Sequence, residues 1–191
     1  AKATASDSFA IGNVATASAA GASVLGGQNN TASGSNSTAI GGGSNTASGD
    51  YSTAKGYYGN ANGIRLKHAT GVYPNQQGAY YVLGYTTSDA TAIALNTSVW
   101  TPNSTNQIVL PNNSAFAFHG TVVAREQAAD GTDCAAWKIE GLIRREGSAS
   151  TTTLVNSAIT VLDNTPSWGL ALSADTTNGC LKIQATGAAA T

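Results

Sequence analysis

The stretch STAIGGGSNTASG, from Ser37 to Gly49, contains one large apolar side chain, Ile40, among residues that are almost all small. Similar stretches occur three more times: SFAIGNVATASA begins at Ser8, SVLGGQNNTASG at Ser23 and STAKGYYGNANG at Ser52. The four starts are 15, 14 and 15 residues apart. Because similarity at a fixed period is typical of stacked repeats, the sequence predicts that this region folds as a series of stacked coils.

Small residues recur at fixed places within the copies. The glycines are Gly12, Gly27, Gly41 and Gly56, and the alanines are Ala17, Ala32, Ala47 and Ala61. Glycine adopts a positive φ at low cost, as tight coil turns require, and alanine suits a narrow interior. Serine, threonine and asparagine are expected to form ladders that satisfy turn amides. A disordered Gly/Ser/Asn linker is the alternative, but linkers keep no such register. Ala69-Thr70-Gly71 is expected to be a fifth, distorted copy.

Each copy has very little apolar surface to bury. The copy from Ser37 offers only Ala39, Ile40 and Ala47, and their burial cannot offset the entropy lost by ordering its backbone. Four such coils still enclose a small core. The sequence therefore predicts that several identical chains share one core, with Ile11, Leu25 and Ile40 as the candidate core residues.

Residues 8–71 resemble the haemagglutinin-like head repeats of trimeric autotransporter adhesins, most clearly in STAIGGGSNTASG. The resemblance implies a left-handed parallel β-roll wound into a homotrimer. The sequence departs from this pattern at Leu25-Gly26, where Ala-Ile is expected, and at Lys55, which stands in the place of Ile40. We therefore expect the last copy to be frayed.

Composition excludes some classes of partner. The chain has 191 residues, 10% of them charged, and a net charge of -1, whereas nucleic-acid binding requires a basic surface. No apolar run is long enough for a transmembrane helix, so we expect no membrane insertion. Residues 1–63 carry only Lys2, Asp7, Asp50 and Lys55, and the other charges follow Ile64. This shift predicts two differently built regions.

The second region alternates apolar and polar residues with the period of a β-strand. Trp137, Ile139 and Ile143 fall on one face of their segment, and Lys138, Glu140 and Arg144 on the other. The remaining alternating segments contain Phe116 and Phe118, then Trp168, Leu170 and Leu172, then Leu181, Ile183 and Ala185. Turns are expected at Asp130-Gly131, Glu146-Gly147 and Asn178-Gly179. The prediction is an all-β chain without helices: β-roll repeats over 1–72, a junction at 73–77 and an antiparallel β-sandwich over 78–191.

The second region resembles a domain of bacteriophage tail fibres in YYVLGYTTSDAT, IVLPNNSAFAFHGTVVARE, AAWKIEGLIRRE and ADTTNGCLKIQATG. In such fibres this domain commonly follows adhesin-type repeats. The resemblance implies a homotrimeric structural and receptor-binding part of a virion tail, attached to the rest of the tail. Its partner would be a bacterial surface receptor, in particular a polysaccharide. The alternatives are the head of an autotransporter adhesin on the bacterial outer surface and a fibre-borne polysaccharide depolymerase.

No motif of a phosphate-binding loop, a serine hydrolase or a zinc protease is present, and we expect neither enzyme activity nor a metal or cofactor. His68, in a loop-like junction, and His119, in a strand, are interpreted as structural or surface residues. Cys134 and Cys180 each open a predicted strand, and two reduced thiols are favoured over a disulfide. Asp130, Asp133 and Asp163 are interpreted as turn residues rather than as a glycan-hydrolysing pair. Arg144 and Arg145 are expected to end a strand on a solvated face.

Aromatic residues supply the candidate ligand-binding positions, because aromatic rings on a polar surface can stack on sugars. Tyr58 and Tyr73 belong to a group of tyrosines near the junction, for which packing between domains is the favoured alternative. Periodicity places Trp137 and Trp168 in the core. Trp100, in the loop-like segment SVWTPNST, is the tryptophan expected to be exposed.

Overall fold

The computed structural model describes residues 1–191 except 74–75, 99–100, 128–130, 165 and 189–191. It divides into two compact units, unit 1 (Ala1–Leu83) and unit 2 (Gly84–Thr191). Both are built from strands, and the only helical segment among the described residues is a 3-10 turn at Ala149–Thr151. The prediction of an all-β chain is confirmed for this part of the chain.

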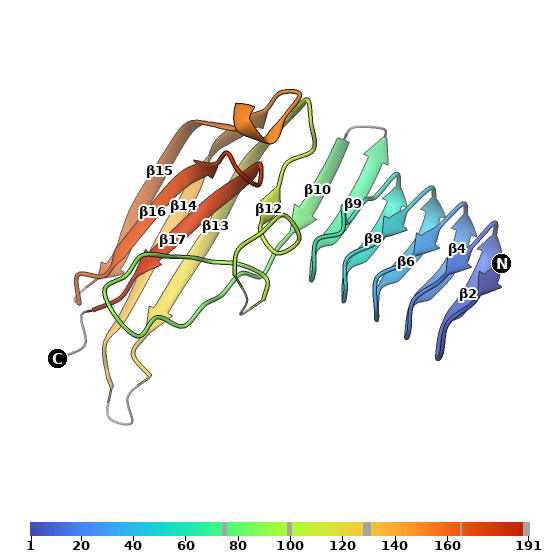
Figure 1. Ribbon diagram of the computed structural model, residues 1–191, viewed down its shortest axis with the longest axis horizontal. Coiled ribbons are helices and arrows are strands. Elements are labelled where there is room, and N and C mark those ends of the chain that lie inside the picture. Colours follow the sequence, from blue (N-terminus) through green and yellow to red (C-terminus); the bar gives the residue numbers. More distant parts are fainter. Residues whose placement is uncertain (74–75, 99–100, 128–130, 165, 189–191) are drawn as a thin grey trace. The chain divides into compact units, whose positions relative to one another are not determined.

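Unit 1 is a stack of parallel coils in which each coil contributes strands to two sheets (Figure 1). The first sheet contains short strands in the order β1 (Lys2–Ala3), β3 (Thr16–Ala17), β5 (Thr31–Ala32) and β7 (Thr46–Ala47). The second contains longer strands: β2 (Phe9–Asn13), β4 (Ser23–Gln28), β6 (Thr38–Gly43), β8 (Thr53–Tyr57), β9 (His68–Tyr73) and the antiparallel β10 (Gln76–Tyr80). The stacked coils, including the predicted fifth copy, are confirmed.

The register of the second sheet corrects two expectations from the sequence. Leu25 pairs with Ile11 on one side and Ile40 on the other, so the second copy begins at Ala22 rather than at Ser23. The expected departure at Leu25-Gly26 is therefore wrong, because Val24-Leu25 occupies the place of Ala39-Ile40. The expected fraying at Lys55 is also wrong, because β8 pairs along its length with β6 and β9.

The interior of the coils contains alanine side chains and two stacked asparagines, Asn30 and Asn45, which form a ladder. The buried apolar residues of this cluster are Ala15, Ala17, Ala22, Val24, Ala32, Ala39, Ala47 and Ala54. Asn45 Nδ2 donates to the carbonyls of Gly41 at 2.9 Å and Gly56 at 2.7 Å, and Asn45 Oδ1 accepts the Gly59 amide at 2.8 Å. Asn30 occupies the equivalent place one coil earlier, and its Oδ1 accepts the Asn45 amide at 2.9 Å. The predicted asparagine ladder therefore satisfies buried backbone groups that the sheets leave unpaired.

Close approach between successive coils explains the glycine at position 42. Its φ is +58°, and a Cβ there would collide with the carbonyl oxygen of Gly56 in the next coil. Glycine does not provide all the left-handed turns, however. One corner of the coil is turned by Val14, Asn29, Ser44 and Tyr58, all with φ between 51° and 62°. Asparagine and other non-glycine residues thus adopt the left-handed conformation at this corner.

The last coil closes the stack with larger side chains. Lys67 occupies the position that Ser37 and Ser52 hold in the two preceding coils, one residue before the longer strand. All three residues are buried. Ile64, in the turn before it, is fully buried as well. β10 then pairs antiparallel with β9, and the Gln77 side-chain oxygen accepts the Asn60 amide at 2.7 Å. Of the segment expected to be a junction, residues 73–77, Tyr73 ends β9 and Gln76 and Gln77 begin β10, whereas 74–75 lie outside the described residues.

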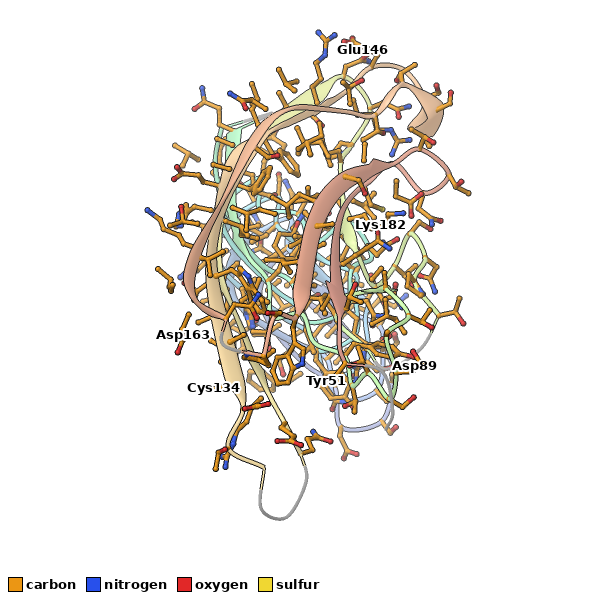
Figure 2. The ribbon with its side chains drawn as sticks, turned by 90° about the vertical axis from the view of Figure 1, so that its left-hand side faces the viewer. Tyr51, Asp89, Cys134, Glu146, Asp163 and Lys182 are labelled. Carbon is orange, nitrogen blue, oxygen red and sulfur yellow. The ribbon has the colours of Figure 1, made fainter. Side chains whose placement is uncertain are left out.

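Unit 2 consists of two antiparallel sheets. One has the order β13 (Ser114–Arg125), β14 (Cys134–Arg145) and β15 (Thr153–Asn164). In the other, β17 (Cys180–Thr186) pairs with β11 (Ile93–Ala94), β12 (Ile108–Val109) and β16 (Gly169–Asp175). Figure 2 shows Cys134 and Glu146 at opposite ends of β14, and Lys182 on β17. The predicted turns at Glu146-Gly147 and Asn178-Gly179 are confirmed, whereas Asp130 lies outside the described residues.

Both sheets of unit 2 have a buried apolar face. Trp137, Ile139 and Ile143 are buried on β14, and Leu181 and Ile183 are buried on β17, as the period-two pattern predicts. On the opposite face of β14, Lys138 and Glu140 form an exposed ion pair at 3.9 Å. The expectation that Trp168 lies in the core is wrong: it is half-buried and precedes β16, where its amide and carbonyl both bond to the Asn164 side chain.

Arg145 departs from the expectation of a solvated arginine pair. Arg144 is exposed and lies 3.6 Å from Glu146, as expected. Arg145 is on the other face of β14, where its Nη1 donates to the Leu110 carbonyl at 2.8 Å and its guanidinium lies against Gly179. Successive residues of a strand point to opposite faces, so only one member of the pair can be solvated. Arg145 thereby connects β14 to the β16–β17 turn of the other sheet.

Candidate assembly and binding surfaces

The three candidate core residues form one row on the outward face of the longer sheet. Ile11, Leu25 and Ile40 pair in register across β2, β4 and β6, with exposures of 56%, 46% and 41%. Their neighbours along the strands, including Val24 and Ala39, point inward and are fully buried. The row, which we call the apolar row, therefore lies outside the alanine interior and contributes nothing to it.

The apolar row is a surface that a single chain leaves in water. Adjacent strands of a sheet are about 4.8 Å apart, so the side chains of Ile11, Leu25 and Ile40 stack in direct succession. Phe9 opens the neighbouring row on the same face and is also exposed. A continuous exposed apolar patch of this kind marks an interaction surface in soluble proteins.

The aromatic candidates are spread over different places. Tyr58 is exposed at a corner of the coil, and its ring lies edge-on to that of Tyr57 with 4.5 Å between centroids. Tyr73 ends β9, and its side chain lies outside the described part of the chain. Trp100 is likewise outside the described residues. Of the three ligand-binding candidates, the structure thus places the ring of Tyr58 alone.

Two further aromatic contacts were not identified from the sequence. The guanidinium carbon of Arg65 lies 5.0 Å from the ring centroid of Tyr51, an exposed tyrosine in the turn before β8. A 15-residue period brings Asp50 and Tyr51 to the same place as Arg65 and Leu66, and in the structure the Asp50 carbonyl accepts the Leu66 amide, so these two turns lie side by side. His68 opens β9, rather than lying in a loop, and its ring is 6.5 Å from that of Tyr80 on β10.

Lys67 is a buried cation whose significance the sequence did not reveal. Its Nζ has no hydrogen-bond partner among the described residues and lies 5.8 Å from the ring centroid of Tyr81. Burial away from water lowers the pKa of Lys67 to about 8, because desolvation disfavours the charged form. The aliphatic stem thus closes the end of the stack at the cost of burying an ammonium group.

Replacing Lys67 by methionine is expected to stabilise the protein at pH 7. Between pH 8 and 10.5 the unfolded chain holds a proton that the folded chain has lost, so the Lys67 contribution to stability rises with pH over this interval. Below pH 8 Lys67 is protonated in both states, and burying its charge lowers the free energy of unfolding by a constant amount of about 3 kcal/mol, as follows from the lowered pKa. Urea unfolding of Lys67→Met and the unmodified protein at pH 7 and pH 10 checks this. The difference in free energy of unfolding between the two proteins should be smaller at pH 10 than at pH 7. An equal difference at both pH values would contradict the lowered pKa of Lys67.

The residues that carry reactive chemistry lie apart from one another. Cys134 is exposed at the start of β14 and Cys180 is buried at the start of β17, and both are free thiols, as expected. Burial raises the pKa of Cys180 to about 12, with the Asp175 carboxylate adding to the rise and Arg145 opposing it. His119 is exposed in β13. The described residues contain no group of three His, Cys, Asp or Glu side chains able to hold a metal ion, and no described helix is long and apolar enough to cross a membrane.

The sheet β13–β14–β15 also presents apolar residues to solvent. They lie mainly on β15 and include Val155, Ile159, Val161 and Leu162. Register shifts opposite Ala136/Trp137 and Leu142/Ile143 interrupt the pairing of β15 with β14. Within the described residues, no strand pairs with the outer edge of β15. Long apolar edge strands are typical sites of contact with other chains.

Comparison of the chain with models of known protein families, with curated proteins and with solved structures found no match.

Proposed function

We propose that this chain is a homotrimeric structural and receptor-binding component of a phage tail fibre, which attaches to a bacterial surface glycan without catalysis. In this proposal unit 1 forms a left-handed parallel β-roll, and three copies wind around one axis. Unit 2 is an antiparallel β-sandwich that carries the receptor contact. The resemblances of the sequence to adhesin head repeats and to a tail-fibre domain supply the biological setting.

The observation that carries the trimer is the apolar row on a coil with an alanine interior. Alanine side chains bury little apolar surface per residue, so the coil itself gains little from folding. The larger side chains of Ile11, Leu25 and Ile40 all point away from this interior. Association of three copies along the row would bury these side chains in a shared core and supply the missing stabilisation.

The sandwich in unit 2 is supported by contacts between its two sheets. The Arg145 guanidinium reaches from β14 to the Leu110 carbonyl and to Gly179 in the β16–β17 turn. Each sheet also buries one apolar face, with Trp137 on β14 and Leu181 on β17. Two sheets that each hide one face are expected to pack against each other.

The proposal predicts a trimer that binds bacteria. Multi-angle light scattering of the purified protein should give three times the 19.1 kDa mass of one chain. Fluorescently labelled protein should bind intact host bacteria, because three linked sites convert weak contacts into avid attachment. This binding should be lost when the surface polysaccharide is removed, since the polysaccharide is the proposed receptor. A single-chain mass would contradict the trimer. Binding that persists without polysaccharide would contradict the glycan receptor but leave the trimer intact.

A further inference from the structure

We propose that Lys55 forms an anion site on the axis of the assembly, where the ammonium groups of three copies bind one multivalent oxyanion of the phosphate or sulfate class. This inference rests on the trimer proposed above, because one chain contributes only one third of the site. It concerns the point at which the apolar row ends and a cation takes its place.

The register places Lys55 in direct continuation of the apolar row. Lys55 pairs with Ile40 on β6 and with Thr70 on β9, and like both of them it is exposed on the outward face. The inward neighbour Ala54 is fully buried. β8 is paired on both sides, so its backbone fixes Lys55 one strand spacing beyond Ile40. If Ile40 of three copies meets at the axis, the three Lys55 side chains start from the same axis.

Within the described residues of unit 1, no carboxylate lies beside Lys55. The acidic residues of unit 1 are Asp7 and Asp50, and both lie in turns rather than on the outward face of the longer sheet. Asp50 Oδ1 accepts the Ser35 amide at 2.9 Å, and this bond holds it at its own turn. The paired residues around Lys55 are uncharged or basic: Thr53, Thr70 and His68. Three ammonium groups gathered at one axis repel one another unless an anion from solution lies between them.

The surroundings of Lys55 supply the hydrogen-bond donors that an oxyanion requires. Thr70 lies directly opposite Lys55 on β9, and its hydroxyl group is a donor on the same face. His68 opens β9 on the neighbouring row and brings an imidazole. A lysine ammonium acts as a point charge for phosphate, and three of them around an axis match the threefold arrangement of oxygens in a tetrahedral oxyanion. The same face nearer to β2 carries isoleucine and leucine instead, so the site is confined to the β8–β9 end.

The experiment measures thermal midpoint, mass and phosphate binding together. The unmodified protein, Lys55→Gln, Lys55→Ile and the control Lys2→Gln are compared in phosphate and in chloride at equal ionic strength. Lys2 is exposed on β1 in the other sheet and is therefore a matched surface lysine. We expect phosphate to raise the thermal midpoint of the unmodified protein and of Lys2→Gln, and calorimetry to give one phosphate for three chains. Lys55→Gln should remain trimeric without this response. Lys55→Ile should show a raised midpoint in both buffers, because it extends the apolar row.

The outcomes separate the two proposals. A trimer whose thermal midpoint is the same in phosphate and chloride would overturn the anion site while the proposed function stands. A phosphate response that survives in Lys55→Gln would also overturn it. The mass of a single chain in every buffer would overturn the trimer, and the anion site with it.

Discussion

Ile40→Asp is expected to prevent assembly and leave a species with the 19.1 kDa mass of one chain. Ile40 is the third residue of the apolar row, and a trimer formed along that row brings three copies of residue 40 to one axis. Three carboxylates there would have to leave water and repel one another, and the Lys55 ammonium groups on the next strand would offset only part of this cost. Light scattering at the concentration where the unmodified protein is trimeric measures this directly. Attachment to bacteria should fall with it, because avidity requires linked copies.

A second variant tests whether a charge prevents assembly only when it lies in the apolar row. Val14 is another exposed aliphatic residue of unit 1, but it lies at a corner of the coil and outside the apolar row. Val14→Asp should therefore assemble like the unmodified protein. If Ile40→Asp stays trimeric, the row is not the axis of assembly. If both variants dissociate, added charge rather than position causes the loss.

Asn45→Ala is expected to lower the free energy of unfolding by about 4 kcal/mol, since each buried backbone group left without a partner costs roughly 1–3 kcal/mol. The substitution removes the donor to the Gly56 carbonyl and the acceptor for the Gly59 amide, whereas the Gly41 carbonyl keeps its bond from Asn30 Nδ2 at 2.8 Å. Both groups belong to the coil after that of Asn45, so the loss should weaken the contact between two successive coils. Urea unfolding at a fixed protein concentration, followed by circular dichroism, measures the loss.

Asn60→Ala provides the control for Asn45. Asn60 is exposed, and its side-chain oxygen makes a local bond to the Asn62 amide at 2.8 Å. Its replacement should change the free energy of unfolding by no more than about 1 kcal/mol, as is usual for one exposed hydrogen bond. Equal losses for the two variants would show that the ladder does not hold the coils together.

The repeats show how far the sequence predicts this fold and where alignment by residue type fails. The period and the small residues predict stacked coils, since few other arrangements use glycine and alanine so regularly. The alignment on serine misplaced the second copy by one residue because Ser8 and Ser23 are alike in type but not in register. Pairing between strands identifies Leu25 as the partner of Ile40, which a count of 14 or 15 residues could not do.

The positions of the charged residues depend on tertiary contacts. Arg144 and Arg145 are adjacent and identical in type, yet one is solvated and the other bonds to Leu110 across the sheets. Lys67 is buried because the stack ends there and a long side chain fills the space. Neither outcome follows from local pattern, since both depend on which distant segment lies opposite. Of the three candidate ligand-binding residues, Tyr58 is the one whose side chain is described, and it is exposed.

The sequence by itself determined the all-β class, the stacked coils and the alternation of faces in the second region. These features are periodic, and the geometry of a strand converts a period in sequence directly into a direction in space. Only the tertiary structure decided the register that aligns Ile11, Leu25, Ile40 and Lys55, the backbone partners of Asn45 in the ladder, the burial of Lys67 and the bond from Arg145 to the Leu110 carbonyl. Each of these depends on contacts between residues distant in sequence, and a local pattern carries no information about which distant segment will be the neighbour.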